Sequence, residues 1–118
     1  MTDNARQGVR DSKVRYILDR YLGKIKSHFA PAQVWVWGSR VYGLPHEFSD
    51  VDMVIVSERF QGVPFWKRRQ LFRDATGIAE DPSAEVVDVL CYTPAEFQDR
   101  SSSPTVVREA VRRGARVA

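Results

Sequence analysis

Residues 33–56 read QVWVWGSRVYGLPHEFSDVDMVIV, and this stretch holds two apolar segments separated by a polar one that contains glycine and proline. The apolar segments, Gln33–Trp37 and Val51–Val56, are rich in β-branched and aromatic residues, which favour β-strands. The second segment is largely apolar on both faces, so we expect it to lie in the centre of a sheet. Residues 39–49 are predicted to form a loop with one helical turn.

Helices are predicted on both sides of this stretch. Apolar residues spaced three and four apart predict a first helix that is capped by Asp11 or Ser12 and ends before Pro31. These residues are Val14, Ile17, Leu18, Tyr21, Leu22, Ile25 and Phe29. A second helix is predicted with Pro64 in its first turn, and Gly77 is a candidate end for it. The apolar side of this helix consists of Phe65, Phe72, Ala75 and Ala79.

The C-terminal part of the chain adds a strand and two helices. Residues 85–92 are mostly apolar and predict a third strand. Residues 93–96 read TPAE, which matches a helix capping box with proline in the first turn. A last helix is predicted over residues 104–113, with Ser103 as its cap and Gly114 at its end. This order, α-β-loop-β-α-β-α-α, predicts an α/β (α+β) fold in which helices flank a small mixed sheet.

The composition is typical of a globular domain. The chain has 118 residues, of which 43% are hydrophobic and 28% are charged. We expect residues 1–9 to form a flexible polar N-terminus and residues 10–118 to form a single domain. The sequence begins without an apolar signal segment and has no apolar run long enough to span a membrane, which predicts a cytoplasmic protein.

Charge and cysteine content narrow the function only slightly. The formal net charge of +3 suits polyanionic partners such as nucleotides or RNA, although a solvated mixed-charge surface explains most of these residues. Cys91 is the only cysteine, so no disulfide can form within the chain. It lies in an apolar segment, and we expect it to be a small buried hydrophobic residue rather than a nucleophile.

Gly38, Ser39 and Arg40 are candidates for binding phosphate. A strand that ends at Gly-Ser and turns into a helical segment exposes backbone N–H groups that can bind phosphate oxygens. Ser39 adds a hydroxyl donor, and Arg40 adds a guanidinium group suited to phosphate. Taken alone, a plain turn explains the three residues at least as well, because Gly-Ser turns are common.

Three aspartates are candidate metal ligands. Asp50 and Asp52 are two residues apart at the start of a strand, so their carboxylates point the same way and repel each other unless a cation binds. The alternative is that both simply end the strand in solvent. Asp88 lies within the otherwise apolar third strand, where an unpaired carboxylate is costly. Its alternative explanation is a structural salt bridge to an arginine.

Together these residues resemble the DNA polymerase beta superfamily of nucleotidyltransferases, and in particular its minimal nucleotidyltransferases. Residues 38–43, GSRVYG, resemble the GSRxxG loop of that family. Residues 48–53, FSDVDM, resemble its SDxDL segment, and residues 87–97, VDVLCYTPAEF, resemble its third strand with the trailing TPxEF. The resemblance covers roughly residues 12–116. One departure is Val41, where a smaller residue is more usual.

The resemblance implies a metal-dependent enzyme with a polymerase-beta-like fold. Asp50 and Asp52 would bridge two Mg²⁺ ions, and Asp88 would bind the one beside the attacking hydroxyl and help to take its proton. Residues 38–40 would hold the β- and γ-phosphates of a nucleoside triphosphate, with ATP as the expected substrate. The minimal family implies transfer of AMP to a hydroxyl of a HEPN-type toxin protein, for which this chain would be the antitoxin; RNA is a further partner that the basic surface allows.

Two other functions remain open at this point. One is a non-catalytic antitoxin or binding module that acts by occluding its partner, and the other is transfer of a nucleotide to a small molecule such as an aminoglycoside. Weaker site candidates have ordinary explanations. We expect His46 to be an exposed loop residue, Trp35 and Trp37 to pack beneath the first helix, and the basic residues Lys67, Arg68, Arg69 and Arg73 to form a solvated helix face.

Overall fold

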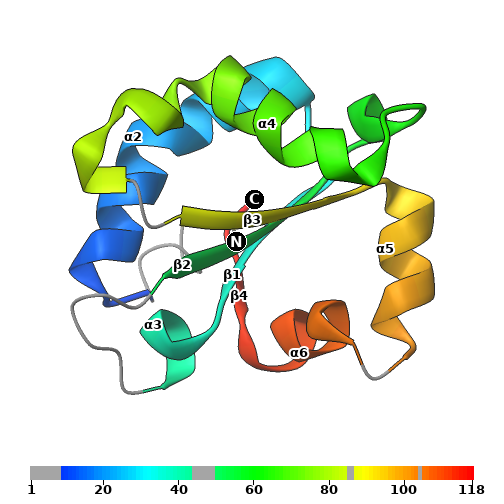
Figure 1. The fold of residues 1–118 in the computed structure, drawn as a ribbon. Coiled ribbons are helices and arrows are strands. Elements are labelled where there is room, and N and C mark those ends of the chain that lie inside the picture. The colour runs from blue at the N-terminus through cyan, green and yellow to red at the C-terminus, as the bar shows by residue number, and fades with distance from the viewer. Residues whose placement is uncertain (1–8, 44–49, 85–86, 104) are drawn as a thin grey trace.

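A computed structural model describes residues 9–43, 50–84, 87–103 and 105–118. Within these ranges, four strands form one mixed sheet in the order β3-β2-β1-β4, with helices on both faces (Figure 1). β1 (Gln33–Trp37) is antiparallel to β2 (Val51–Val56) and to β4 (Ala115–Arg116), whereas β3 (Val87–Tyr92) is parallel to β2. The predicted class, a small mixed sheet flanked by helices, is confirmed, and β2 has the predicted central place.

Helices α2 and α4 cover one face of the sheet (Figure 1). α2 (Ser12–Phe29) begins at Asp11, whose carboxylate accepts hydrogen bonds from the backbone amides of the first turn. The Asp11 cap is therefore confirmed, and the helix ends before Pro31 as predicted. α4 (Phe65–Thr76) begins just after Pro64 and ends at Gly77, which adopts a left-handed conformation with φ 72°.

Ala79 does not lie on α4, contrary to the prediction. It belongs to the short 3₁₀ helix η2 (Ile78–Glu80) and is exposed, because the left-handed turn at Gly77 redirects the chain before the apolar stripe could continue. Two further 3₁₀ helices, η1 (Glu58–Phe60) and η3 (Pro82–Ala84), were not predicted. They are single turns, and a single turn leaves little periodic signal in a sequence.

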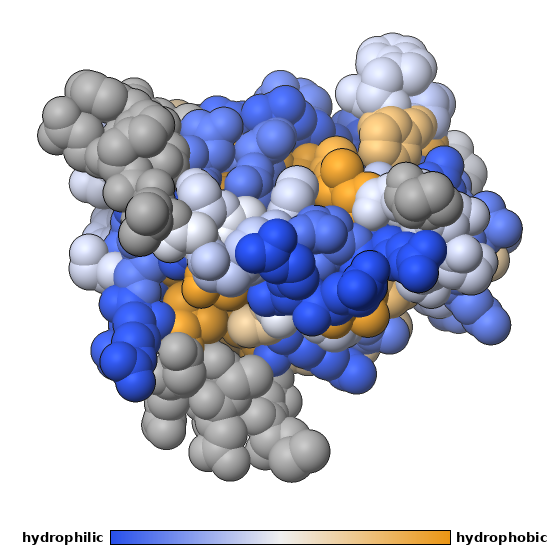
Figure 2. Space-filling view, turned by 90° about the horizontal axis from the view of Figure 1, so that it is seen from below, coloured by the Kyte–Doolittle hydropathy of each residue, from blue (hydrophilic) through white to orange (hydrophobic). Residues whose placement is uncertain are grey.

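Helices α5 and α6 cover the other face. The predicted capping box is confirmed, since Thr93 and Glu96 exchange hydrogen bonds at the start of α5 (Pro94–Ser101). α6 (Val106–Arg113) is capped by Thr105 rather than by Ser103, and it ends at Gly114 as predicted. Seen from below Figure 1, the surface over this face is mainly hydrophilic, with small apolar areas between hydrophilic side chains (Figure 2).

The sheet separates two apolar clusters. Alternate strand residues, such as Val34, Met53 and Val89, pack with α2 and α4. The intervening residues face α5 and α6, and Trp35 and Trp37 belong to this second cluster. The expectation that both tryptophans pack beneath the first helix is therefore wrong: their side chains lie on the opposite face, because the pleat alternates and Val34 and Val36 occupy the α2 side.

Residues near both ends of the described part of the chain are placed by packing that the sequence did not indicate. Val9, which was expected to belong to a flexible N-terminus, is buried in the α2 and α4 cluster, while residues 1–8 lie outside the described ranges. The unpredicted strand β4 is only two residues long and pairs with β1 through Trp35 and Val36. None of the described helices combines the length and apolar character needed to cross a membrane.

Candidate functional site

The sheet places two of the predicted aspartates side by side. Asp52 and Asp88 are each the second residue of a strand, and they are direct neighbours in the parallel register between β2 and β3. Each lies two residues before a residue that faces α5 and α6, Val54 in β2 and Leu90 in β3, so alternation directs both aspartate side chains to that side of the sheet. The parallel pairing of β2 and β3 therefore brings together carboxylates that are far apart in sequence.

Asp50 completes a cluster of three carboxylates. It lies just before β2, and one oxygen from each of Asp50, Asp52 and Asp88 can be chosen so that all lie within 4.8 Å of one another. Asp50 is exposed, whereas the other two are partly buried. Carboxylate oxygens at this spacing fit the ligand preference of Mg²⁺ and similar hard cations. The donor set is thus chemically suited to the divalent metal that the sequence predicts.

Burial and neighbouring charges disfavour the ionised form of Asp52. Burial, followed by the nearby charges of Asp88 and Asp50, raises the pKa of Asp52 from its ordinary value of 3.8 to about 6. The predicted repulsion between strand-start carboxylates is therefore present. A bound cation would offset this repulsion and favour the ionised form.

Position 38 requires a glycine because its backbone lies close to the side chain of Asp52. Its φ of 89° lies in a region that residues with a side chain rarely adopt, and an added Cβ atom would overlap Oδ2 of Asp52. Gly38 is also the cap of α3 (Ser39–Tyr42), which is the helical turn predicted for this loop. The turn after β1 therefore lies directly beside the carboxylate cluster.

The turn itself is compact. The backbone carbonyl of Gly38 accepts from the amides of Val41 and Tyr42, and that of Ser39 accepts from the amide of Gly43. The backbone N–H groups of the first turn of α3 lie at the N-terminal end of that helix, where such groups can bind phosphate oxygens. These groups, with the Ser39 hydroxyl, are the donors that the sequence assigns to phosphate. His46 falls outside the described residues.

Arg40 is placed differently from the expectation. Its side chain is only 8% exposed, and Nη1 lies 2.9 Å from Oδ2 of Asp11, the residue that caps α2. The guanidinium therefore links the turn after β1 to the start of the first helix. Phosphate binding by Arg40, predicted from its place after Gly-Ser, would require it to leave or share this carboxylate and stays a prediction.

Asp88 also forms an ion pair with an arginine, which is the alternative explanation that the sequence allowed for this residue. Nη2 of Arg69, on α4, lies 3.2 Å from Oδ1 of Asp88, and the two side chains are 56% and 41% exposed. Asp88 lies near the start of β3 rather than in its buried middle, so the argument from costly burial is wrong. The carboxylate belongs both to an exposed ion pair and to the aspartate cluster.

Sequence reasoning missed two residues at this site. Arg69 was assigned to a solvated helix face, and its position beside Asp88 depends on how α4 packs against β3, which no local pattern reveals. Trp37 is the β1 neighbour of Asp52, and its indole Nε1 is buried without a hydrogen-bond partner in the described part of the chain. That neighbour relation follows from the β1–β2 register, which the sequence does not specify.

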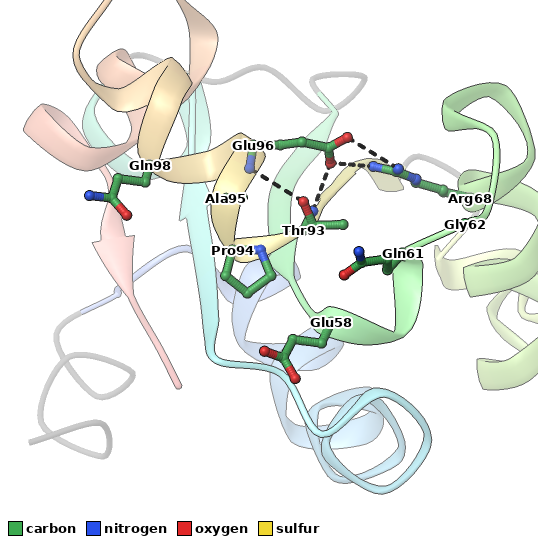
Figure 3. A pocket seen from close by; sticks show the side chains of 9 residues that line it. All are labelled: Glu58, Gln61, Gly62, Arg68, Thr93, Pro94, Ala95, Glu96 and Gln98. Atoms are coloured by element: carbon green, nitrogen blue, oxygen red, sulfur yellow. Dashed lines mark hydrogen bonds and ion pairs between the residues drawn. The ribbon is translucent and has the colours of Figure 1, made fainter.

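Arg68 was also predicted to be solvated, and this is wrong. Arg68 is buried, and its guanidinium makes two hydrogen bonds to the carboxylate of Glu96 (Figure 3). It also donates one hydrogen bond to each of the carbonyls of Val63 and Cys91. The predicted burial of Cys91 is confirmed, and it raises the pKa of that thiol to about 12. Arg68 therefore ties α4 to β3 and α5.

A pocket of about 480 Å³ opens beside this ion pair (Figure 3). It is lined by residues that follow β2 and β3, whereas the aspartates lie at the start of these strands. Its lining includes Glu58 and Gln61 as well as Arg68 and Glu96. The charged groups at its base already satisfy each other, as the dashed lines in Figure 3 show. We therefore place the candidate site at the aspartate cluster rather than in this pocket.

Comparison with known structures shows the same kind of fold. A candidate nucleotidyltransferase from Sulfolobus solfataricus has a TM-score of 0.50 at 18% identity, covering 84% of this chain and 78% of its own. BolA1 from Arabidopsis thaliana gives 0.53 at 22%, covering 66% and 92%, and a Bol-like protein from Babesia bovis gives 0.52 at 22%, covering 79% and 94%. At these identities the likeness shows the fold alone.

Comparison at the level of sequence is more specific. No curated protein sequence matches the chain significantly. A family model described as the nucleotidyltransferase domain matches residues 18–114, a range that contains the Gly38–Ser39 turn and all three aspartates. The resemblance drawn from the sequence motifs is thereby confirmed for the family. Because the match extends over most of the chain, from within α2 to the end of α6, the chain belongs to the nucleotidyltransferase domain family.

Proposed function

We propose that this chain is a metal-dependent nucleotidyltransferase that transfers AMP from ATP to a hydroxyl group of a partner protein. The observation that carries the proposal is the meeting of Asp50, Asp52 and Asp88, with an oxygen of each within 4.8 Å, in a member of the nucleotidyltransferase family. Family membership supports nucleotidyl transfer in general. The metal, the nucleotide and the acceptor are the parts that this proposal adds.

The aspartates would hold the metal. Asp50 and Asp52 are suited to bridging two Mg²⁺ ions, and Asp88 to binding the one nearer the acceptor. When bound, the ions would supply charge stabilisation for the entering and leaving oxygens. Gly38 leaves space beside Asp52 that a side chain would fill. Ser39 and the first amides of α3 would then hold the β- and γ-phosphates.

The proposed reaction is an in-line displacement at the α-phosphorus. The acceptor oxygen forms a bond to that phosphorus while the bond from the phosphorus to the α,β-bridging oxygen breaks, and pyrophosphate leaves. The proton of the acceptor hydroxyl passes to Asp88 or to water. Asp88 suits this role because it is partly exposed and lies at the outer strand of the sheet, where an acceptor can approach.

The openness of the cluster supports a macromolecular acceptor. Asp50 is exposed and Asp88 is 41% exposed, so the hydroxyl side of the site is accessible to a docked protein. A protein acceptor brings its own positioning energy from the surface that it buries. On the resemblance to minimal nucleotidyltransferases, we propose a tyrosine hydroxyl of a HEPN-type toxin as the acceptor, with this chain as the antitoxin.

The proposal is tested by incubating the chain with ATP, Mg²⁺ and a HEPN-type protein encoded beside it, followed by intact mass measurement. A mass increase of one or more AMP groups on the partner is expected. Label on an RNA 3′ end or on an aminoglycoside would reject the protein acceptor. A partner that is inhibited without any mass change, even by Asp52→Asn, would favour the non-catalytic antitoxin that acts by occlusion.

A further inference from the structure

Arg69 reaches the aspartate cluster from the opposite side of the sheet. α4 packs on the face away from the Asp52 and Asp88 side chains, and the α4 and β3 elements are in contact. β3 is the edge of the sheet, so a long side chain from α4 can pass around it. Arg69 uses this route, and its guanidinium lies 3.2 Å from the Asp88 carboxylate.

The ion pair occupies a ligand position. Among the described residues, Arg69 is the positively charged group that forms an ion pair with one of the three clustered carboxylates. Oδ1 of Asp88 cannot coordinate a metal ion freely while the guanidinium binds it, and a positive group there also repels an approaching cation. Both side chains of this ion pair are exposed, however, and exposed ion pairs contribute only about 0–1 kcal/mol to stability. Arg69 can therefore be displaced at low cost.

We propose that Arg69 competes with the divalent cation for Asp88 until the nucleotide phosphates give its guanidinium another anionic partner, so that metal and nucleotide bind cooperatively. This inference rests on the proposed function. An arginine guanidinium pairs well with phosphate, and the 56% exposed side chain is free to change direction. When no nucleotide is present, competition from Arg69 would keep the affinity of the site for the metal ion low.

The test compares Arg69→Gln with Arg73→Gln and Arg69→Lys. Arg73→Gln removes the same charge from the same helix, and no ion pair of Arg73 is found within the described ranges. Calorimetry measures Mn²⁺ affinity with and without a non-hydrolysable ATP analogue. Without nucleotide, Arg69→Gln should bind Mn²⁺ about two- to fivefold more tightly than wild type, as expected for loss of one exposed ion pair. Arg73→Gln and Arg69→Lys should stay close to wild type.

The nucleotide arm tests the exchange itself. The factor by which the analogue tightens Mn²⁺ binding should be smaller in Arg69→Gln than in wild type, because the competitor is already absent. An unchanged factor, or Mn²⁺ binding in Arg69→Gln no tighter than in Arg73→Gln, would overturn the inference while leaving the proposed function intact. Failure of every variant, wild type included, to bind Mn²⁺ even with the analogue present would overturn both.

Discussion

At the scale of single residues, the folded chain disfavours the ionised form of Asp52. Its pKa is raised to about 6 by burial and by two neighbouring carboxylates. The folded chain therefore binds more protons than the unfolded chain between about pH 4 and pH 6. Stability must fall as pH rises through that window, and the ionised carboxylate destabilises the metal-free chain above it.

Asp52→Asn should therefore stabilise the metal-free chain at neutral pH. We expect the free energy of unfolding in EDTA to rise by about 1 kcal/mol at pH 7.5, allowing for partial solvent screening, and to change little at pH 4. Urea unfolding at the two pH values measures this. Asp50→Asn, which alters an exposed carboxylate, should have a smaller effect. Destabilisation by Asp52→Asn at pH 7.5 would show that the carboxylate is structural.

Gly38 tests the close approach of the turn to Asp52, and Gly62 provides a matched control. Both have positive φ, 89° and 78°, but a Cβ at Gly62 would meet nothing within 4 Å. Gly62→Ala should cost about 1–2 kcal/mol from backbone strain and keep metal affinity. Gly38→Ala should cost more and weaken Mn²⁺ binding at least tenfold, as measured by urea unfolding and calorimetry. Equal behaviour of the two variants would contradict the account.

At the scale of elements, the ion pair between Arg68 and Glu96 holds α4 to α5. Hydrogen bonds from Arg68 are the main reason that the pKa of Glu96 is lowered to about 2. A lowered pKa means that this stabilisation is present above the ordinary value of 4.5 and is lost as pH falls toward 2.

Glu96→Gln should consequently destabilise the chain at neutral pH by about 1–3 kcal/mol, because it leaves the buried guanidinium of Arg68 without its charged partner. The loss should shrink between pH 4.5 and pH 2. Glu58→Gln alters an exposed carboxylate of the same pocket and should change stability by less than about 0.5 kcal/mol. Urea unfolding across this pH range gives the comparison, and equal losses for the two variants would be evidence against the ion pair.

Elements with a local signal were predictable from the sequence. The stripe from Val14 to Phe29, the capping box at Thr93 and the central apolar strand each depend on residues close together in the chain. The β4 strand and the face of Trp35 and Trp37 were not, because a two-residue strand has no period and the pleat alone does not say which helix covers which face. Those features are decided by long-range pairing.

At the scale of the whole molecule, the site depends on the crossover between two parallel strands. The sequence indicated three aspartates, and the β2–β3 register explains why they meet. What the sequence could not indicate is the basic group beside them, because Arg69 belongs to the crossover helix and its contact with Asp88 depends on how that helix packs against the edge strand. Motifs therefore indicate the three aspartates, whereas the proposed role of Arg69 at the metal site depends on packing between α4 and β3.

The measurement that most directly tests the central claim uses ATP labelled either at the α- or at the γ-phosphate. Each is incubated with Mg²⁺, the chain and a dialysed cell extract that supplies protein and RNA acceptors, and macromolecules are resolved on a denaturing gel. We predict label on a macromolecule from α-labelled ATP only, with wild type and not with Asp52→Asn, while both variants remain folded. Label from γ-labelled ATP that depends on the wild-type chain, or equal α-label transfer by Asp52→Asn, would contradict nucleotidyl transfer by the aspartate cluster.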